Sequence, residues 1–339
     1  MFAAMKFRRW GAAVVAACAV ALVGPSVHAE AAPAGISTRY VSSMSTGPLA
    51  PPPMLFGGIS GIDDLGGGRY AMISTDVGRF GPARFFTAKI PTNTAYFMAQ
   101  PSLTGVSMVL GPNNLPMLGG SGQFEGIRGF GRDFVVVSGG DHQFVRIIGG
   151  GGNFLRELSL PAAYRPGKGV GLAGQRGLTG VAVSPSGKIS VLTAGGLRQD
   201  APNAARLLTF GKPNTEFVYR TDPDKVAADV LAVNNTDYLV LERGAGRTTS
   251  IYWATTRGAT NVAGQQQVGG AASMRKSQIF STIPLTRLSA GNISGMAWGG
   301  WHPNDRWADY RARTLILVSN DVFSGNTRLH ALEYRSPKN

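Results

Sequence analysis

The chain has 339 residues, 43% of them hydrophobic, and it carries 33 lysines and arginines against 19 aspartates and glutamates, a net charge of +14. This length is sufficient for a sizeable apolar core, and the positive charge favours anionic partners such as small anionic solutes or acidic cell-envelope polymers. The sequence has no RRM, OB-fold or helix-turn-helix signature, which argues against nucleic acid as a partner.

The first 29 residues have the anatomy of an export signal. Three basic residues precede an apolar run over 10–23, and Val-His-Ala at 27–29 is typical of a cleavage site. The run is too short for a stable membrane span, so we expect no transmembrane anchor after cleavage. We predict a secreted, periplasmic or cell-envelope protein whose mature part, residues 30–339, is a single domain with a net charge of +11 once the three signal charges are lost.

The signal leaves two variants open. Cys18 ends a short stretch resembling a lipoprotein box, although the apolar run continues past it, and Arg8-Arg9 resembles part of a twin-arginine signal. Cys18 is also the single cysteine of the chain, so the mature protein has no disulfide and no cysteine-ligated metal.

Beyond the signal, the pattern is that of an all-β protein. Short runs of β-branched and aromatic residues are bounded by glycine, proline, asparagine and aspartate, and long amphipathic helix patterns are missing. The clearest predicted strands are 69–74, 83–88, 134–138, 188–193, 238–242, 314–319 and 328–333.

A repeated unit organises these strands. Each unit starts with a short Gly-hydrophobic or related strand, followed by a turn and a second strand. The five unit starts are Ser60-Gly61-Ile62, Glu125-Gly126-Ile127, Thr179-Gly180-Val181, Ala228-Asp229-Val230 and Ser294-Gly295-Met296.

Units of short antiparallel strands at intervals of this kind predict a β-propeller of five or six blades around a central channel. A sixth blade has room in residues 96–123, and a two-sheet sandwich is the alternative fold. We expect residues 39–45 to add a strand that closes the ring against the last blade.

The same unit starts and strands resemble those of the esterase-like phytase family over nearly the whole mature chain, from about Gly57 to Tyr334. The stretches that carry the resemblance are 56–62, 74–76, 81–86, 124–127, 239–243, 292–297 and 313–323. The resemblance implies a secreted or periplasmic propeller and, from the family name, hydrolysis of esters or phosphate esters. The family commonly has glutamate where this chain has Thr179 and Ser294, and acids where it has Thr75, Gly139 and Asn320.

Equivalent positions in a propeller converge on its axis, so acids at unit starts and strand ends are candidate site residues. Asp76, Glu125, Glu242 and Asp321 form the predicted metal site, since clustered carboxylate oxygens suit Ca²⁺. A bound cation holds phosphate and activates water, with Glu125 and Asp76 as the catalytic acids. The predicted substrate-binding residues are Arg79, Arg84, Arg243 and His142.

Structural roles are the alternative for each of these acids, for example an interblade pair involving Glu242-Arg243. No Gly-x-Ser-x-Gly elbow is present, which disfavours a serine esterase. The four glycines at 149–152 lack the Lys-Ser/Thr of a phosphate loop and predict a hairpin tip. An aromatic insertion, Trp298 to Tyr310, predicts either a sugar-stacking surface or channel cover, or a lid packed on its own blade.

Two functions remain open from sequence. The first is an exported, cation-dependent hydrolase of phosphate esters or simple esters. The second is a non-catalytic envelope propeller that binds an anionic ligand or a protein partner, which the missing acids and the four histidines of the chain favour.

Overall fold

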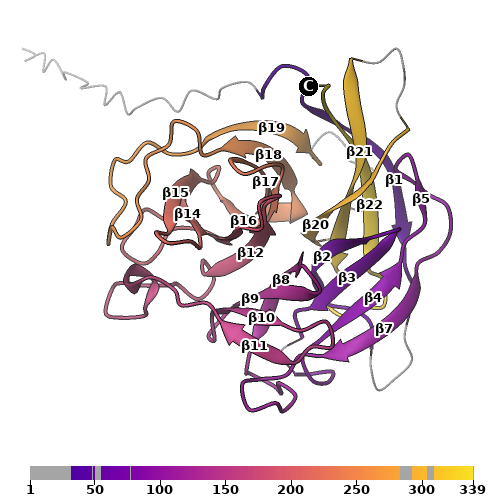
Figure 1. The fold of residues 1–339 in the computed structure, drawn as a ribbon, viewed down its shortest axis with the longest axis horizontal. Coiled ribbons are helices and arrows are strands. Elements are labelled where there is room, and N and C mark those ends of the chain that lie inside the picture. Colours follow the sequence, from indigo (N-terminus) through magenta and orange to yellow (C-terminus); the bar gives the residue numbers. More distant parts are fainter. Residues whose placement is uncertain are drawn as a thin grey trace, which may run out of the picture.

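A computed structural model describes residues 32–47, 49, 55–76, 78–282, 292–303 and 309–338. Over these residues the fold is a five-bladed β-propeller, in which each blade is a four-stranded antiparallel sheet (Figure 1). The all-β propeller prediction is confirmed, with five blades. The predicted export signal, Cys18 and Trp307 lie outside the described residues.

The blades follow one another along the chain, each built from its innermost strand outward except for the last. Blade 1 is β2 (Ile59–Gly66), β3 (Arg69–Ser74), β4 (Arg84–Lys89) and β7 (Ser102–Met108). Blade 2 is β8 (Gln123–Phe130), β9 (Asp133–Gly139), β10 (Phe144–Ile148) and β11 (Phe154–Glu157). Blade 3 is β12 (Leu178–Val183), β13 (Ile189–Thr193), β14 (Ala204–Thr209) and β15 (Thr215–Arg220).

Blade 4 is β16 (Lys225–Ala232), β17 (Asp237–Gly244), β18 (Thr249–Thr255) and β19 (Arg275–Ser281). Blade 5 is β20 (Asn292–Trp301), β21 (Tyr310–Asn320), β22 (Arg328–Pro337) and β1 (Ser37–Ser45). Two 3₁₀ turns, η1 (Ala162–Tyr164) and η2 (Ala245–Arg247), complete the described elements, together with the two-residue strands β5 (Thr92–Asn93) and β6 (Tyr96–Phe97). None of the described helices is long and apolar enough to cross a membrane.

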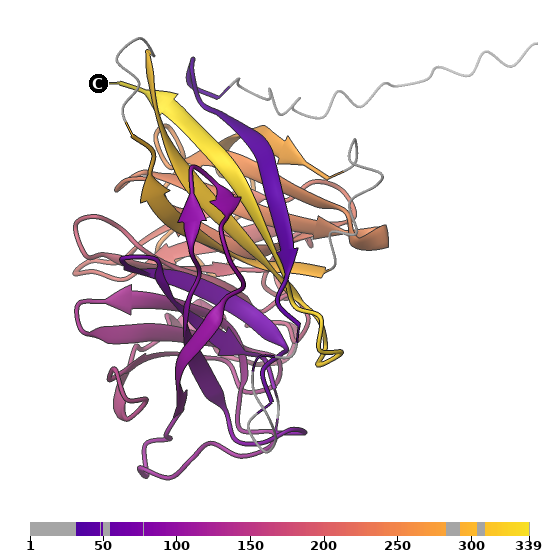
Figure 2. The same ribbon diagram turned by 90° about the vertical axis from the view of Figure 1, so that its right-hand side faces the viewer.

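The N-terminal strand closes the ring. β1 pairs antiparallel with β22, from Ser37 opposite Arg335 to Ser45 opposite Arg328, and Figure 2 shows the two strands side by side. The predicted closing strand is therefore confirmed. The segment considered for a sixth blade supplies β6, the outer strand β7 and an isolated bridge between Leu110 and Pro116, so it belongs to the periphery of blade 1.

The five innermost strands share one irregularity. β2, β8, β12, β16 and β20 surround the centre in Figure 1, and each is bulged near its start. The residues passed over in the pairing are Ser60, Glu125, Thr179, Ala228 and Ser294. A bulge re-aims the side chain of its extra residue. The five unit starts were predicted to occupy equivalent positions around the channel, and each does lie at the bulge of an innermost strand.

Glycine after the bulge allows the inner strands to approach closely. A Cβ added to Gly61 would lie 2.9 Å from Cα of Gly126, and one added to Gly180 would lie 2.8 Å from N of Val230. Such contacts are closer than a methyl group tolerates. In blade 4 the residue after the bulge is Asp229 instead of glycine. Its carboxylate lies at the centre of the ring, where it binds Arg128.

The apolar core lies between adjacent blades. One cluster joins Ile73 and Phe85 of blade 1 to Phe124 and Val136 of blade 2, and the others repeat this pattern around the ring. Burial between blades, at roughly 25 cal/mol per Å², stabilises a chain whose single cysteine allows no internal disulfide.

Candidate functional site

The middle of the channel is filled by a buried ion pair. Nη2 of Arg128, on β8, lies 3.0 and 2.9 Å from the two carboxylate oxygens of Asp229, on β16. Nη1 of Arg128 donates to O of Ile62, at 2.7 Å, and N of Met296 donates to Asp229 at 2.8 Å. Four of the five inner strands are thereby joined at the axis.

Asp63 stands beside this pair on β2. Its Oδ2 accepts from N of Gly129, at 2.7 Å, while its Oδ1 lies 4.0 Å from Nε of Arg128. Burial raises the pKa of Asp63 to about 6, against the opposing effects of Arg128 and of the Gly129 N–H.

Three of the five bulge residues hold neighbouring blades together. The hydroxyl of Ser60 donates to O of Phe124 at 2.7 Å, and that of Ser294 donates to O of Ile59 at 2.8 Å. The hydroxyl of Thr179 donates to O of Ala228 at 3.1 Å. These short side chains therefore have a structural function.

Glu125 is the bulge residue with an acidic side chain, and it lies at the mouth of the channel above the Arg128–Asp229 pair. Its Oε1 accepts a hydrogen bond from Nε2 of Gln123 at 2.6 Å, and Gly139 packs against its Cγ. Burial raises the pKa of Glu125 to about 7, with Gln123 and Arg243 acting in the opposite direction. A carboxyl group near neutrality is suited to both accepting and releasing a proton.

Arg243 faces the same mouth from β17. Its Nη1 donates to Oδ1 of Asn292 on β20, at 3.1 Å. Burial lowers the pKa of Arg243, and Glu125 opposes this shift. Among the described residues Arg243 has no carboxylate within ion-pair distance, so Glu125 and Arg243 influence each other without direct contact. The mouth thus pairs a carboxyl group with a cation that has not been neutralised.

Asp76 and Arg84, both predicted for the site, are held by other groups. Oδ2 of Asp76 accepts from Nη1 of Arg84 at 2.9 Å, and Oδ1 accepts from the backbone of Arg79 at 2.9 Å. Arg84 is fully buried and also donates to two backbone carbonyls. Arg79 is exposed and its guanidinium lies over the Phe80 ring. This group fixes the turn after β3 in place.

Glu242 is completely buried. It accepts from Tyr219 at 2.6 Å, from Lys276 at 2.6 Å, and from the backbone of Asp222 at 3.0 Å. Tyr219 belongs to blade 3, so Glu242 ties two blades together. Arg243 likewise reaches a neighbouring blade, through Asn292.

Asp321 caps the turn between β21 and β22. Its oxygens accept from the backbone of Phe323 and Asn326, and also from N of Gly58 at 2.9 Å, which joins blade 5 to blade 1. Within the described ranges, no three histidine, cysteine, aspartate or glutamate side chains come together as a metal site. The four predicted acids therefore do not converge, and their oxygens do not offer the open ligand set that Ca²⁺ requires.

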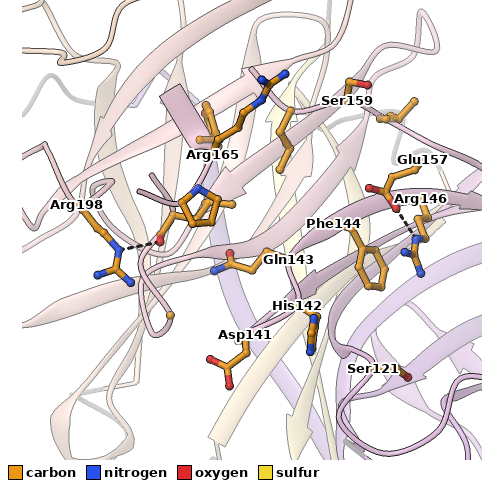
Figure 3. A pocket seen from close by; sticks show the side chains of 17 residues that line it. Ser121, Asp141, His142, Gln143, Phe144, Arg146, Glu157, Ser159, Arg165 and Arg198 are labelled. Atoms are coloured by element: carbon orange, nitrogen blue, oxygen red, sulfur yellow. Dashed lines mark hydrogen bonds and ion pairs between the residues drawn. The ribbon is translucent and has the colours of Figure 1, made fainter. Parts of the chain in front are cut away.

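His142 lies at the β9–β10 turn and lines a pocket of about 660 Å³ between blades 2 and 3 (Figure 3). The turn is at the same end of the blade as Glu125, because Gln123 is opposite Gly139 in the sheet. Gly140 lines the pocket, and the residue before it, Gly139, lies next to Glu125. The pocket therefore begins close to Glu125. The turns after β3 and β21, which hold Asp76 and Asp321, lie at the same end of their own blades. The predicted residues therefore share one face of the ring, but their side chains bind separate partners there.

The aromatic insertion occupies the opposite end of blade 5. Trp298 packs edge-on against Tyr334, with ring centroids 5.0 Å apart, and Arg313 lies 4.3 Å from the Trp298 ring and 4.8 Å from the Trp301 ring. The described part of the insertion is packed on its own blade, while Trp301 remains half exposed. It does not border the mouth that contains Glu125.

Two features of the site were not predicted from the sequence. The Arg128–Asp229 pair has a visible signal, because Asp229 stands where the other four units have glycine. Gln123 lies two residues before Glu125 on the same strand, so its contact was open to prediction but was not considered. Asn292 has no signal in the sequence, because only the ring brings it next to Arg243.

The fold and site define a five-bladed propeller in which a half-buried carboxyl group, Glu125, and a half-buried arginine, Arg243, face the same axial mouth. The chain belongs to the phytase-like family: the family model described as esterase-like activity of phytase matches residues 54–322. The resemblance predicted from the sequence is confirmed.

Solved structures match the chain at low identity and with low TM-scores. A glucose dehydrogenase-type putative oxidoreductase from Thermus thermophilus is 14% identical, with 88% of this chain and 100% of that chain covered and a TM-score of 0.42. A PQQ-bound aldose sugar dehydrogenase from Streptomyces coelicolor is 12% identical, with 90% and 100% covered and a TM-score of 0.44. No curated protein matches the sequence.

Proposed function

We propose that this protein is an exported hydrolase of phosphate esters or simple esters, with Glu125 as its acid–base residue and Arg243 as the group that binds the ester oxygen. The single observation that carries the proposal is the state of Glu125, a carboxyl group with a pKa of about 7 that shares the channel mouth with an arginine free of any carboxylate partner among the described residues. Membership of the phytase-like family supports an enzymatic role.

In the proposed reaction, the Glu125 carboxylate takes a proton from water as the water oxygen forms a bond to the ester carbon or phosphorus. Negative charge then develops on the non-bridging oxygen, where the guanidinium of Arg243 stabilises it. The bond to the leaving alkoxide breaks, and the alkoxide receives the proton held by Glu125. Gln123 positions the carboxyl group through its hydrogen bond.

No step is assigned to a metal ion. Asp76, Glu242 and Asp321 already accept hydrogen bonds from arginine, lysine, tyrosine and backbone donors, so the described residues do not fit a calcium site. The basic composition supports an anionic substrate or envelope polymer as partner.

The second function is a non-catalytic envelope propeller that binds an anionic ligand. The observation that favours it is the use of Ser60, Thr179 and Ser294 as structural hydrogen-bond donors, which leaves Glu125 as the acidic bulge residue.

The test is hydrolysis of p-nitrophenyl phosphate and p-nitrophenyl acetate by the mature protein, with and without a chelator. We expect Glu125→Gln to lower kcat/KM by about 10²-fold or more, the usual contribution of a general base, and Arg243→Met to lower it similarly. Asp133→Asn, at the far end of the same blade, is the matched control and should retain activity.

Wild-type protein without turnover of either ester would favour the binding function. Turnover that survives Glu125→Gln would place the chemistry elsewhere. Turnover abolished by the chelator and restored by Ca²⁺ would contradict the metal-free route.

A further inference from the structure

We infer that the pocket between blades 2 and 3 binds an organic anion with an apolar body, a carboxylate or phosphate attached to an aromatic or branched group. This deepens the proposed function, on which it rests for taking that anion as part of the substrate. The pocket has a volume of about 660 Å³, within the range of small-molecule sites.

The floor of the pocket is apolar. Phe144, Leu158, Leu160 and Leu172 contribute to its lining, and Phe144 and Leu172 are themselves buried. Figure 3 shows the Phe144 ring between Gln143 and Arg146. An aromatic or branched group placed here would be removed from water, at a gain of roughly 25 cal/mol per Å².

The charges of the lining do not cancel. Arg146 is paired with Glu157 at 2.8 Å. On the other side of the pocket in Figure 3, the Arg165 side chain has no hydrogen-bond partner among the described residues. Arg198 donates from Nε to O of Leu172 at 3.2 Å, which leaves both of its Nη groups without a partner in the described structure. Both arginines can therefore take carboxylate or phosphate oxygens.

Asp141 is the acid that opposes this attraction. It is exposed on the turn before His142, and it forms no ion pair within the described ranges. The lining outside the Arg146–Glu157 pair thus has two cations and one anion, and removing the anion should strengthen binding.

The wall that carries the two arginines is rigidly held. Tyr164, the last residue of η1, donates to Glu216 at 2.9 Å, and N of Arg198 donates to O of Gly171 at 2.9 Å. Gly171 has φ +89°, and a Cβ on it would lie 2.2 Å from O of Arg165. Such a pre-formed wall reduces the entropy cost of binding.

Calorimetric titration with phenyl phosphate, benzoate and the neutral benzyl alcohol tests the inference. We expect both anions to bind at least tenfold more tightly than the alcohol, with an affinity that falls as salt is added. Arg165→Ala and Arg198→Ala should each weaken anion binding at least fivefold, and Asp141→Asn should strengthen it. Arg156→Ala, an exposed arginine on β11 outside the pocket, is the matched control.

Leu160→Ala tests the apolar half of the ligand separately from the anionic half. It should weaken the binding of phenyl phosphate but leave the binding of inorganic phosphate unchanged. Absence of anion binding by the wild type, or an equal loss in Arg156→Ala, would overturn the inference. Binding that persists in Glu125→Gln without any wild-type turnover would support the pocket and refute the proposed hydrolysis. Wild-type turnover with a KM that is unchanged in the Arg165→Ala/Arg198→Ala double variant would support the proposed hydrolysis and refute the role of the pocket in binding the substrate.

Discussion

Arg128 of blade 2 and Asp229 of blade 4 meet at the axis of the propeller, with one guanidinium nitrogen 3.0 and 2.9 Å from the two carboxylate oxygens. Neither side chain is more than 3% exposed. The pair lies three residues further along β8 than Glu125 and joins four of the five inner strands, so it stabilises the centre of the ring.

Breaking this pair should destabilise the protein strongly. Asp229→Asn leaves the buried Arg128 cation with only the more distant Asp63 carboxyl group, and we expect a loss of about 3–5 kcal/mol in the free energy of unfolding, measured by urea denaturation. Arg39→Ala is the control, because Arg39 is half exposed in its pair with Glu333 and should contribute at most about 1 kcal/mol. Equal, small losses in both variants would show that the axial pair is dispensable.

The raised pKa of Asp63 predicts how stability depends on pH. Its carboxyl group titrates near pH 6 when folded and near 3.8 when unfolded, so between these values the folded state holds the proton more tightly. Stability therefore falls as pH rises from about 4 to 6, by roughly 2–3 kcal/mol from this group.

Asp63→Asn removes this dependence. Its free energy of unfolding should equal that of the wild type near pH 3.5 and exceed it above pH 6, because the penalty of ionising a buried carboxyl group is gone. Asp224→Asn, at an exposed turn, controls for the change of net charge. A difference between Asp63→Asn and wild type that stays constant across this range would contradict the assignment.

The glycines after the bulges give a prediction about packing. A Cβ at Gly61 would meet Cα of Gly126 at 2.9 Å, and backbone atoms cannot move aside as a flexible side chain does. Gly61→Ala should cost about 1–3 kcal/mol of unfolding free energy. Gly151→Ala, in a hairpin tip where an added Cβ meets nothing within 4 Å, should be neutral or slightly stabilising, and thermal denaturation of both variants makes the comparison.

The ring could be predicted from the sequence because it repeats. Five unit starts recur in one setting, and each of Ser60, Glu125, Thr179, Ala228 and Ser294 proves to be the bulge residue of an inner strand. The closing strand was predictable for the same reason, since the last unit has three strands of its own and the N-terminal segment supplies the fourth.

The separate roles of the predicted acids could not be foreseen from the sequence, because residue type alone does not say which donors a carboxylate meets. Asp76 accepts backbone N–H groups of its own turn, and Glu242 is saturated by a lysine and a tyrosine from other strands. Such bonds depend on the path of each turn and on blade contacts that no pattern in the sequence specifies. Glu125 differs because its protein partner is a neutral amide, Gln123.

That difference sets the last prediction, the pH dependence of hydrolysis. As a general base Glu125 must be ionised, and since burial raises its pKa to about 7, kcat/KM should rise with pH and level off above about 7.5. Arg243→Met removes the cation that opposes the raised pKa, so the rise in the residual activity should move to higher pH. Gln123→Leu should shift it in the same direction, because the carboxylate loses a hydrogen-bond donor. A profile that rises near pH 4.5 in all three proteins would assign proton transfer to an ordinary exposed carboxylate and remove Glu125 from the mechanism.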